Sequence, residues 1–416
     1  MAQITATIRP EEVGMSSERL ARIDDHFRTY VDDGRLPGYS VAVARYGQLA
    51  HVSHYGMRNV EDKLPITADT MYRIYSMTKP ITSVACMMLV EEGKLQLTDE
   101  VREFIPSFGK TEVFRGGSSL APLTEPQREQ MRVWHLLTHT AGFTYGFNYY
   151  DAIDDMYRRA GFDYGIPQAD SLEQICDRYA ALPLVFHPGT SWNYSVATDI
   201  LGRVVEVVSG MTLDRFFEER IFAPLGMHDT AIGQRKDLAD RHIFPDFRGK
   251  PPQEHLSRHN NDPQGAFKDE TAEMPWVGGI STVPDLFRFA EMLRRGGTLN
   301  GARILSPATI GLATQNWTGD KPNELYKAVA INHGWEPYPA YIGLGFCLRG
   351  ELVCPNLFGT LPSPGTYGNY GSGSTLFWVD PETDLTFVYL SAGIMQQAPN
   401  IERFQRLSDI AASAVL

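Results

Sequence analysis

The sequence predicts an α/β protein in which an antiparallel sheet flanked by helices adjoins a mostly helical domain. Strand-like segments occur near both ends of the chain, whereas the middle is typical of helices and long loops. A chain of 416 residues with 43% hydrophobic and 21% charged residues can bury a large core. Because the strand signals lie at both ends, we expect the two ends to build one sheet domain.

The N-terminal elements are predicted to be a helix followed by a hairpin. The helix is expected over residues 17–31. Residues 40–44 and 49–52 then form two apolar-rich segments on either side of a tight turn at Tyr46 and Gly47. Two strand-like segments joined by so short a turn are typical of an antiparallel hairpin.

The remaining elements differ between the middle and the C-terminal part of the chain. Residues 97–270 contain helical patterns, long loops and frequent proline and charged residues, without a convincing series of strands. Strand signals return after Gly278. Three candidate strands and a closing helix are residues 342–348, 375–379, 385–390 and 399–416. We therefore expect a discontinuous sheet domain of residues 1–96 and 271–416 around a mainly helical domain of residues 97–270.

The tetrad SMTK at residues 76–79 places a hydroxyl and an amine one helical turn apart. Ser76 is a candidate nucleophile and Lys79 a candidate base. Pro80 has no N–H and cannot bond back to the carbonyl of Ser76, so regular helix should begin at or just after the serine. This leaves amides near Ser76 free to bind an oxyanion.

Two later motifs accompany this tetrad. Residues 188–195 (PGTSWNYS) form a turn that leads into a predicted helix and offer the hydroxyl of Tyr194 at its entry. Residues 367–374 (YGNYGSGS) lead directly into a predicted strand. Their glycines allow the backbone to lie close to a ligand.

With these motifs the chain resembles the serine penicillin-recognising superfamily. Within it the chain most resembles the family VIII carboxylesterases, relatives of class C β-lactamases and DD-peptidases. Beyond the tetrad, the matching segments are LLTHTAG at 136–142, PGT at 188–190 with Tyr194 and Ser195, PLGM at 224–227 and GGIST at 278–282. Several motifs in one order are far more specific than any one of them. The resemblance implies the β-lactamase/transpeptidase-like fold, with the active site in the cleft between the two domains.

The resemblance also implies a mechanism through an acyl ester on Ser76. Lys79 acts as a base only when unprotonated, so its pKa must fall well below the usual 10.4. Tyr194 completes the proton relay by resemblance. The backbone amides of Ser76 and Ser372 are expected to form the oxyanion hole.

Departures from the family pattern bear on the substrate. Val196 stands where β-lactamases have an asparagine that holds the substrate's amide, and Asn369, followed by Tyr370 and Gly371, stands where they have a lysine. A shift of one residue in this alignment would place Tyr370 there instead. Because asparagine offers no positive charge for a β-lactam carboxylate, both differences favour neutral esters.

An aromatic segment at residues 143–150 is a candidate wall or lid of an apolar acyl pocket. Its members expected to bind substrate are Tyr145, Phe147 and Tyr149. A buried loop anchor is the equally favoured alternative for this segment. Weaker candidates for the same wall are Trp335, Tyr338 and Tyr341.

Neither a metal nor an organic cofactor is expected. His135 and His139, like His255 and His259, have the four-residue spacing of helical zinc ligands, but no glutamate follows the first histidine of either pair. No phosphate-binding loop or dinucleotide fingerprint occurs in the sequence. His139 is expected to be a structural hydrogen-bonding residue.

Composition bears on partners and location. A net charge of −12 and a pI near 5.4 argue against nucleic acid or an anionic membrane as a partner. No segment has eighteen uninterrupted apolar residues, and the N-terminus lacks the pattern of an export signal. Four widely spaced cysteines suggest reduced thiols. A cytoplasmic location is therefore expected.

The function predicted from these observations is a serine carboxylesterase acting on small-molecule, short-chain esters, with acyl transfer to alcohols as a second use of the acyl-enzyme. A β-lactamase or D-alanyl-D-alanine carboxypeptidase is the alternative enzyme. A non-enzymatic binding protein with the penicillin-recognising fold is the third reading, which intact Ser76, Lys79 and Tyr194 disfavour.

Overall fold

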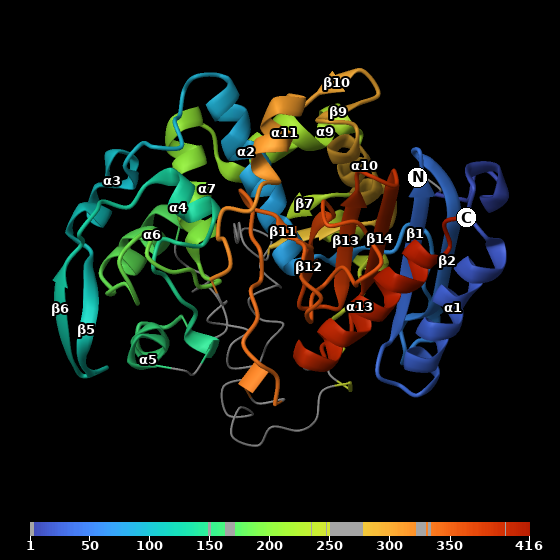
Figure 1. Ribbon diagram of the computed structural model, residues 1–416, viewed down its shortest axis with the longest axis horizontal. Coiled ribbons are helices and arrows are strands. Elements are labelled where there is room, and N and C mark those ends of the chain that lie inside the picture. Colours follow the sequence, from blue (N-terminus) through green and yellow to red (C-terminus); the bar gives the residue numbers. More distant parts are fainter. Residues whose placement is uncertain are drawn as a thin grey trace.

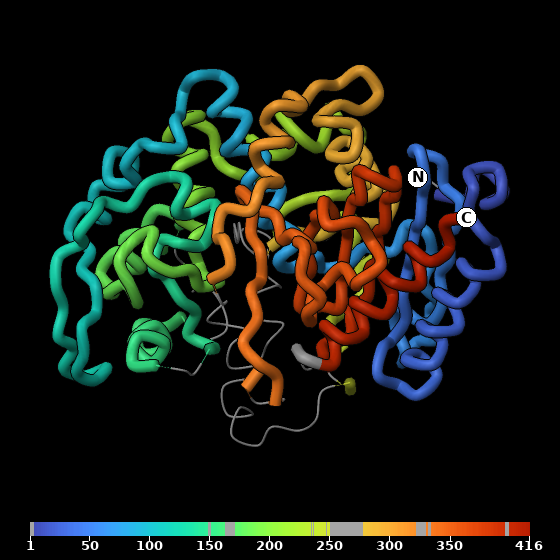
Figure 2. The backbone as a smooth tube through the Cα atoms, in the orientation of Figure 1, coloured from blue at the N-terminus to red at the C-terminus, as the bar shows by residue number. Residues whose placement is uncertain are grey.

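The main feature of the fold is one antiparallel sheet built from both ends of the chain (Figures 1 and 2). The computed structural model describes residues 4–148, 151–162, 171–233, 235–246, 248–249, 278–321, 330–331, 334–395 and 397–416. Within these residues the main sheet has seven strands in the order β11-β12-β13-β14-β1-β2-β3. Every neighbouring pair is antiparallel. The α/β class predicted from the sequence is confirmed.

The sheet combines a long N-terminal hairpin with C-terminal strands. Its strands are β1 (Gly38–Arg45), β2 (Gln48–Asn59), β3 (Leu64–Pro65), β11 (Cys347–Leu348), β12 (Tyr367–Gly371), β13 (Thr375–Asp380) and β14 (Leu385–Ser391). The predicted hairpin turn has positive φ at both Tyr46 (54°) and Gly47 (76°), the backbone conformation that suits a two-residue hairpin turn. β1 lies between β2 and β14, so the first strand is central.

Alternate residues of the central strands pack in two different layers. Val41 and Val43 of β1 join an apolar cluster with α1 (Ser17–Asp32) and α13 (Gln397–Ser413). Ala42 and Ala44 join a larger cluster that includes α10 (Val283–Arg294). This period of two explains why both faces of the strand are apolar: each is covered by helices.

A second group of elements lies on the other side of the molecule, with α2 between it and the sheet (Figure 1). Besides the intervening α2 (Thr78–Glu91), its helices are α3 (Val101–Phe104), α4 (Val133–Leu137), α5 (Ala152–Arg159), α6 (Leu172–Ala180) and α7 (Ala197–Ser209). Two short helices, α8 (Leu213–Phe217) and α9 (Ala223–Leu225), follow α7 in the chain. Twelve residues of α2, from Thr78 to Leu89, are buried. α2 is therefore an internal helix, and α7 packs along it.

Smaller strands and helices complete the described elements. A three-stranded sheet joins β4 (Tyr72–Arg73), β8 (Gly279–Ser281) and β7 (Ala231–Ile232). The other short elements are β9 (Thr298–Leu299), β10 (Ala302–Arg303), α11 (Pro307–Ala313) and the 3-10 or π segments Pro10–Val13, Tyr75–Met77, Pro106–Lys110, Gly146–Asn148, Glu218–Phe222 and Lys236–Arg241.

Two sequence expectations about strands are wrong. The middle of the chain contains a hairpin of β5 (Glu112–Ser118) and β6 (Ala121–Pro126), with a register irregularity after Phe114. Leu120 in its turn and Leu123 in β6 are exposed, so the hairpin lacks the alternation of a half-buried strand. Of the candidate strand 342–348, only Cys347 and Leu348 are strand. Gly345 has φ 87°, and a Cβ there would lie 1.9 Å from the Ser83 hydroxyl. That segment turns against α2 instead of extending.

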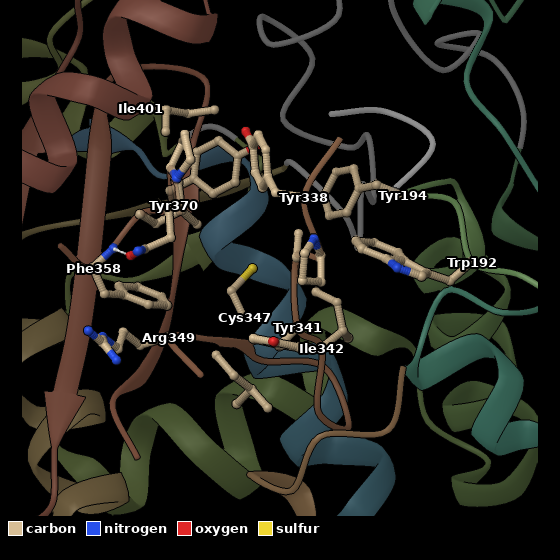
Figure 3. A pocket seen from close by; sticks show the side chains of 16 residues that line it. Trp192, Tyr194, Tyr338, Tyr341, Ile342, Cys347, Arg349, Phe358, Tyr370 and Ile401 are labelled. Carbon is tan, nitrogen blue, oxygen red and sulfur yellow. Dashed lines mark hydrogen bonds between the residues drawn. The ribbon is translucent and has the colours of Figure 1, made fainter. Parts of the chain in front are cut away.

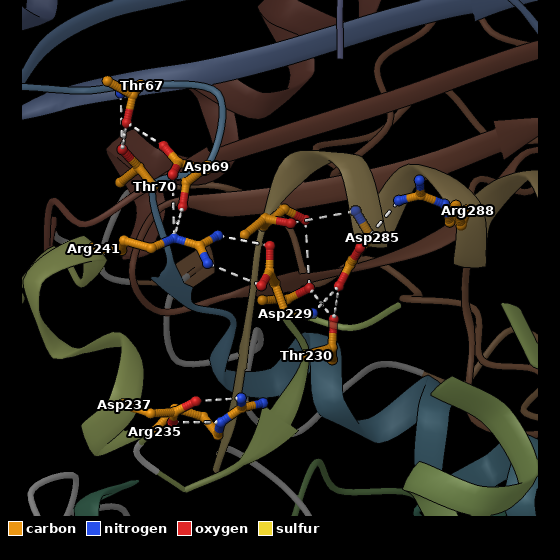
Figure 4. Close-up of polar contacts among 12 residues, drawn as sticks. Thr67, Asp69, Thr70, Asp229, Thr230, Arg235, Asp237, Arg241, Asp285 and Arg288 are labelled. Atoms are coloured by element: carbon orange, nitrogen blue, oxygen red, sulfur yellow. Dashed lines mark hydrogen bonds and ion pairs between the residues drawn. The ribbon is translucent and has the colours of Figure 1, made fainter. Parts of the chain in front are cut away.

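A polar network fixes the loops that precede β4 and β7 and joins them to α10 (Figure 4). Arg241 donates two bonds to the carboxylate of Asp229, at 2.9 and 2.6 Å, and a third to the Asp69 carbonyl at 2.9 Å. The Asp229 amide in turn donates to the Asp285 carboxylate at 2.8 Å. Bidentate arginine–carboxylate pairs hold a defined geometry, so the network ties the segment before Ser76 to α10.

The predicted division into residues 1–96 with 271–416 and residues 97–270 stays a prediction. The boundary at 270 and 271 lies outside the described residues. No helix in the described part of the chain is long and apolar enough to cross a membrane.

Candidate active site

A strained turn presents the predicted nucleophile. Tyr75, directly before Ser76, is buried and has φ 48°, a left-handed conformation that is rare for a residue with a side chain. The Thr78 hydroxyl donates to the Tyr75 carbonyl at 2.7 Å and accepts from the Gly279 amide at 3.0 Å. These bonds hold the turn, and regular helix begins at Thr78, two residues after the serine, as the sequence predicts.

Ser76 and Lys79 lie in contact. The Lys79 Nζ donates to the Ser76 Oγ at 3.1 Å, and both residues are buried. Burial lowers the pKa of Lys79 to about 7, because desolvation penalises the charged amine, although Asp199 and Cys347 act in the opposite direction. A large fraction of the amine is therefore neutral near pH 7, the form that accepts a proton from a hydroxyl.

Tyr194 approaches the same amine from the segment before α7. The Lys79 Nζ lies 4.6 Å from the centre of the Tyr194 ring. Burial raises the pKa of the Tyr194 hydroxyl well above its usual value and Tyr370 adds to this, whereas the nearby Ser76 hydroxyl lowers it. The two hydroxyls do not form a hydrogen bond in this structure, and the Tyr194 hydroxyl is buried without a partner among the described residues.

His139 holds the backbone next to Tyr194 and lies beside its ring. Its Nδ1 accepts the Ser195 amide at 3.2 Å, its carbonyl accepts the Asn193 amide at 3.0 Å, and its ring centre lies 4.7 Å from that of Tyr194. Burial, together with the nearby Lys79, lowers the pKa of His139 to about 3. A neutral His139 thus anchors the backbone on both sides of Tyr194, which agrees with the structural role predicted for it.

The turn between β12 and β13 packs against the strained segment. A Cβ on Gly371 would lie 2.3 Å from the Ile74 carbonyl oxygen, and one on Gly373 would lie 2.6 Å from the Tyr75 ring. Ser372, between these glycines, is exposed. Glycine at both positions brings the predicted oxyanion donor Ser372 beside the segment that carries Ser76.

Asn369 and Tyr370 occupy neighbouring positions on β12 but point to different surroundings. Asn369 is buried, and its Oδ1 accepts from the Tyr370 amide at 2.7 Å and from the Cys347 thiol at 3.8 Å. Tyr370 faces the ring of Phe404 edge-on and lines a pocket. Neither side chain brings a positive charge to the site.

A pocket adjoins Tyr194 and is shown in Figure 3. Its cavity volume is about 30 Å³, and the pocket is partly open to solvent. Its lining residues are Trp192, Tyr194, Tyr338, Pro339, Ala340, Tyr341, Ile342, Cys347, Leu348, Arg349, Pro355, Asn356, Leu357, Phe358, Tyr370 and Ile401. Of the weaker candidates, Tyr338 and Tyr341 line this pocket; Trp335 does not, and its ring lies 6.5 Å from that of Tyr338.

The aromatic segment that was expected to wall an acyl pocket lies near Lys79 and Tyr194, with the Tyr145 ring 5.9 Å from that of Tyr194. Tyr145 is buried, stacks on Phe147 at 4.6 Å, and has its ring 5.9 Å from the Lys79 Nζ. Val196 is also buried, at the start of α7. Tyr145, Phe147 and Val196 do not line the pocket in Figure 3. Tyr149 lies outside the described residues.

Asp199 and Cys347, two groups that act electrostatically on Lys79, were missed from the sequence. Asp199, on the first turn of α7, is fully buried, and neither carboxylate oxygen has a hydrogen-bond partner in the described structure. Burial raises its pKa well above the usual value, which Lys79 opposes. Cys347 lines the pocket, and burial raises the pKa of its thiol to about 12.

Metal ligation finds no support in the part of the chain that the structure describes. No group of three histidine, cysteine, aspartate or glutamate side chains there has the arrangement of a metal site. The Nδ1 of His135 accepts the Arg132 amide at 3.0 Å, so that nitrogen is engaged. His255 and His259 lie outside the described residues.

Relatives of known sequence cover most of the chain. It is 31% identical over 394 residues to Protein Rv1367c of Mycobacterium tuberculosis, which spans 90% of this chain and 89% of that protein. It is 30% identical over 304 residues to Esterase EstB of Burkholderia gladioli, which spans 70% of this chain and 74% of the esterase.

Solved structures share the fold. EstCE1, described as a hydrolase with promiscuous acyltransferase activity, superposes with a TM-score of 0.76 at 24% identity, over 95% of this chain and 98% of EstCE1. A family VIII carboxylesterase superposes with a TM-score of 0.69 at 21% identity, over 96% and 99% of the two chains. The family model described as Beta-lactamase matches residues 23–409. The resemblance drawn from the motifs is thus confirmed, and the chain belongs to the Beta-lactamase family.

Proposed function

We propose that this protein is a serine carboxylesterase that hydrolyses short-chain esters through an acyl-Ser76 intermediate. The observation that carries the proposal is the buried contact of 3.1 Å between the Lys79 amine and the Ser76 hydroxyl. A lysine whose pKa is lowered to about 7 serves as a base at neutral pH. Similarity to Esterase EstB over 304 residues supports an ester as the substrate.

In the acylation step, the Ser76 oxygen attacks the carbonyl carbon of the ester. Its proton passes to the Lys79–Tyr194 pair, and the carbonyl oxygen becomes an oxyanion that the amides of Ser76 and Ser372 would stabilise. When the bond from carbon to the alcohol oxygen breaks, the pair returns the proton to the departing alkoxide. One oxyanion donor is typically worth about 3 kcal/mol of transition-state stabilisation.

In the second step, water gives a proton to the same pair and its oxygen bonds to the acyl carbon. The Ser76 oxygen leaves that carbon and takes the proton back, so the enzyme is regenerated. An alcohol in place of water gives a new ester. Similarity of fold to EstCE1, a hydrolase with promiscuous acyltransferase activity, agrees with including acyl transfer in the proposal.

The chemistry near the nucleophile favours esters over β-lactams. Val196 and Asn369 replace an amide-binding group and a cation that the β-lactamase pattern contains, and both side chains are buried as neutral groups. The Asn369 oxygen is engaged by the Tyr370 amide and the Cys347 thiol. A β-lactam carboxylate would therefore find no counter-ion at this position.

A cytoplasmic location is part of the proposal. It is supported by the four cysteines, all of which are unpaired thiols in the structure. Proteins of oxidising compartments tend to pair their cysteines. Fractionation of the source cells with an antibody to the protein would test it, and recovery outside the cytoplasm would contradict it.

A comparison of p-nitrophenyl esters with nitrocefin tests the function. Wild type should hydrolyse acetate and butyrate esters and act poorly on nitrocefin, and a brief quench should show an acyl mass increment on Ser76. Ser76→Ala should lose both turnover and the adduct. Ser83→Ala, which alters another buried serine of α2, is the matched control and should keep both. An adduct on a different residue would refute the assignment.

A further inference from the structure

Arg349 is a buried cation held by backbone carbonyls. It follows β11, is 6% exposed, and donates from its two terminal nitrogens to the Gly350 carbonyl at 2.6 Å and the Thr360 carbonyl at 2.7 Å. Its Nε is buried and has no hydrogen-bond partner in the described part of the chain. A guanidinium has five N–H donors, so most of its donors are left for another acceptor.

No counter-ion balances this charge among the described residues. None of their aspartate or glutamate oxygens forms an ion pair with Arg349 within 4.0 Å. Buried charges in proteins are normally paired, because desolvation of an isolated ion is costly. Backbone carbonyls satisfy hydrogen bonds but carry no net charge. The site is therefore electrostatically incomplete.

Arg349 also lines the pocket beside Tyr194 (Figure 3). Of the residues that line it, Arg349 is the one that carries a charge near neutral pH; the others are apolar, aromatic or neutral polar side chains. The Arg349 amide bonds to the Thr366 carbonyl. Asn369 is three residues further along that segment, about 10 Å away at strand spacing. By this spacing along the strand, a group bound by Arg349 would lie away from the position of Asn369.

We propose that Arg349 binds a carboxylate on the substrate, so that the preferred esters carry a carboxylate remote from the scissile bond. The proposal rests on the proposed esterase function and deepens it. The carboxylate can belong to the acyl group, as in a half-ester of a dicarboxylic acid, or to the alcohol. A guanidinium offers parallel donors that match both oxygens of a carboxylate. The chain's net charge of −12 repels anions in general, so a preference for an anionic ester reports a local contact.

The kinetic test compares matched substrates. Mono-4-nitrophenyl glutarate, which carries a carboxylate on its acyl group, is compared with its methyl ester. 4-Butanoyloxybenzoate, which carries a carboxylate on its alcohol part, is compared with its own methyl ester. In wild type, kcat/KM should favour the anionic member of one pair. Arg349→Gln should reduce that preference by about 10-fold to 100-fold, the range for charge-assisted bonds, with the neutral ester little changed. Arg22→Gln, the same charge change on exposed α1, is the control.

A binding test separates this proposal from the esterase function. Glutarate, but not glutaramide, should raise the melting temperature of wild type and should compete with p-nitrophenyl butyrate; Arg349→Gln should lose both effects. If no ester is hydrolysed but glutarate still binds through Arg349, the esterase function fails and the carboxylate site stands. If Arg349→Gln does not fold, the wild-type comparison of glutarate with glutaramide decides. Equal effects of the two compounds, or an anionic preference that persists in Arg349→Gln, would overturn the proposal.

Discussion

The pH dependence of acylation is the most direct consequence of the buried lysine. The lysine must be neutral to take the serine proton, and burial lowers the pKa of Lys79 to about 7. The neutral fraction of such a group is about 10% at pH 6 and about 90% at pH 8. With the usual pKa of about 10.4 it would stay below about 1% over this range. The structure therefore predicts an acylation rate that rises about tenfold between these pH values and then levels off.

Single-turnover kinetics with p-nitrophenyl acetate measures this rise of the acylation rate with pH, here called the rising limb, without interference from deacylation. The substrate has no ionising group in the range, and the phenol is followed at a wavelength where both its forms absorb equally. The limb belongs to Lys79 and Tyr194 together, so Tyr194→Phe should displace it while the fold, followed by circular dichroism, stays intact. A rate independent of pH between about 6 and 9, or a limb centred near the free lysine value, would refute the reasoning.

Three further predictions follow from the same geometry. Lys79→Ala and Tyr194→Phe should each lower ester turnover about 100-fold or more, and the double variant should be little worse, because the groups act as a unit; additive losses would mean separate roles. Lys79→Met should raise the melting temperature at pH 7. Between about pH 7 and 10.4 the lysine binds more protons in the unfolded state than in the folded state, because burial lowers its pKa in the folded state to about 7. Burying the lysine therefore destabilises the native state at neutral pH, and this destabilisation decreases as the pH rises. A gain that does not shrink toward pH 10 would contradict this. Asn369→Lys should improve nitrocefin turnover relative to ester turnover by about 10-fold or more; an unchanged ratio, measured at several pH values, would show that this residue does not face the substrate.

Local patterns explain which parts of the site were predictable. Ser76 and Lys79 are three residues apart on one helix entry, so their contact follows from helix geometry and from Pro80. The hairpin at Tyr46 was predictable for the same reason, since its turn and both strands are contiguous. Tyr194 required the motif order as well, because only the resemblance related it to a helix far away in sequence.

Packing across the chain explains what the sequence did not yield. The strand expected over residues 342–348 is replaced by a turn because Gly345 packs against Ser83, about 260 residues earlier. Tyr338 and Tyr341, which ranked below residues 143–150 as candidates for the acyl pocket, line the pocket beside Tyr194; substrate binding by residues 143–150 stays a prediction. Arg349 and Asp199 carry no local signal of burial. Both are buried with unpartnered polar atoms, and this follows from packing between segments that are far apart in the sequence.

The central position of β1 constrains the order in which the molecule forms during synthesis. Its neighbour β14 is made 340 or more residues later, with Tyr39 opposite Ser391 and Arg45 opposite Leu385. Until then the open edge of the N-terminal hairpin offers unpaired backbone groups to other chains. At about 5–20 residues per second, the emerging chain spends on the order of tens of seconds in this condition. Refolding from denaturant, in which both halves are present at once, should therefore aggregate less than synthesis that is stalled before β14 emerges.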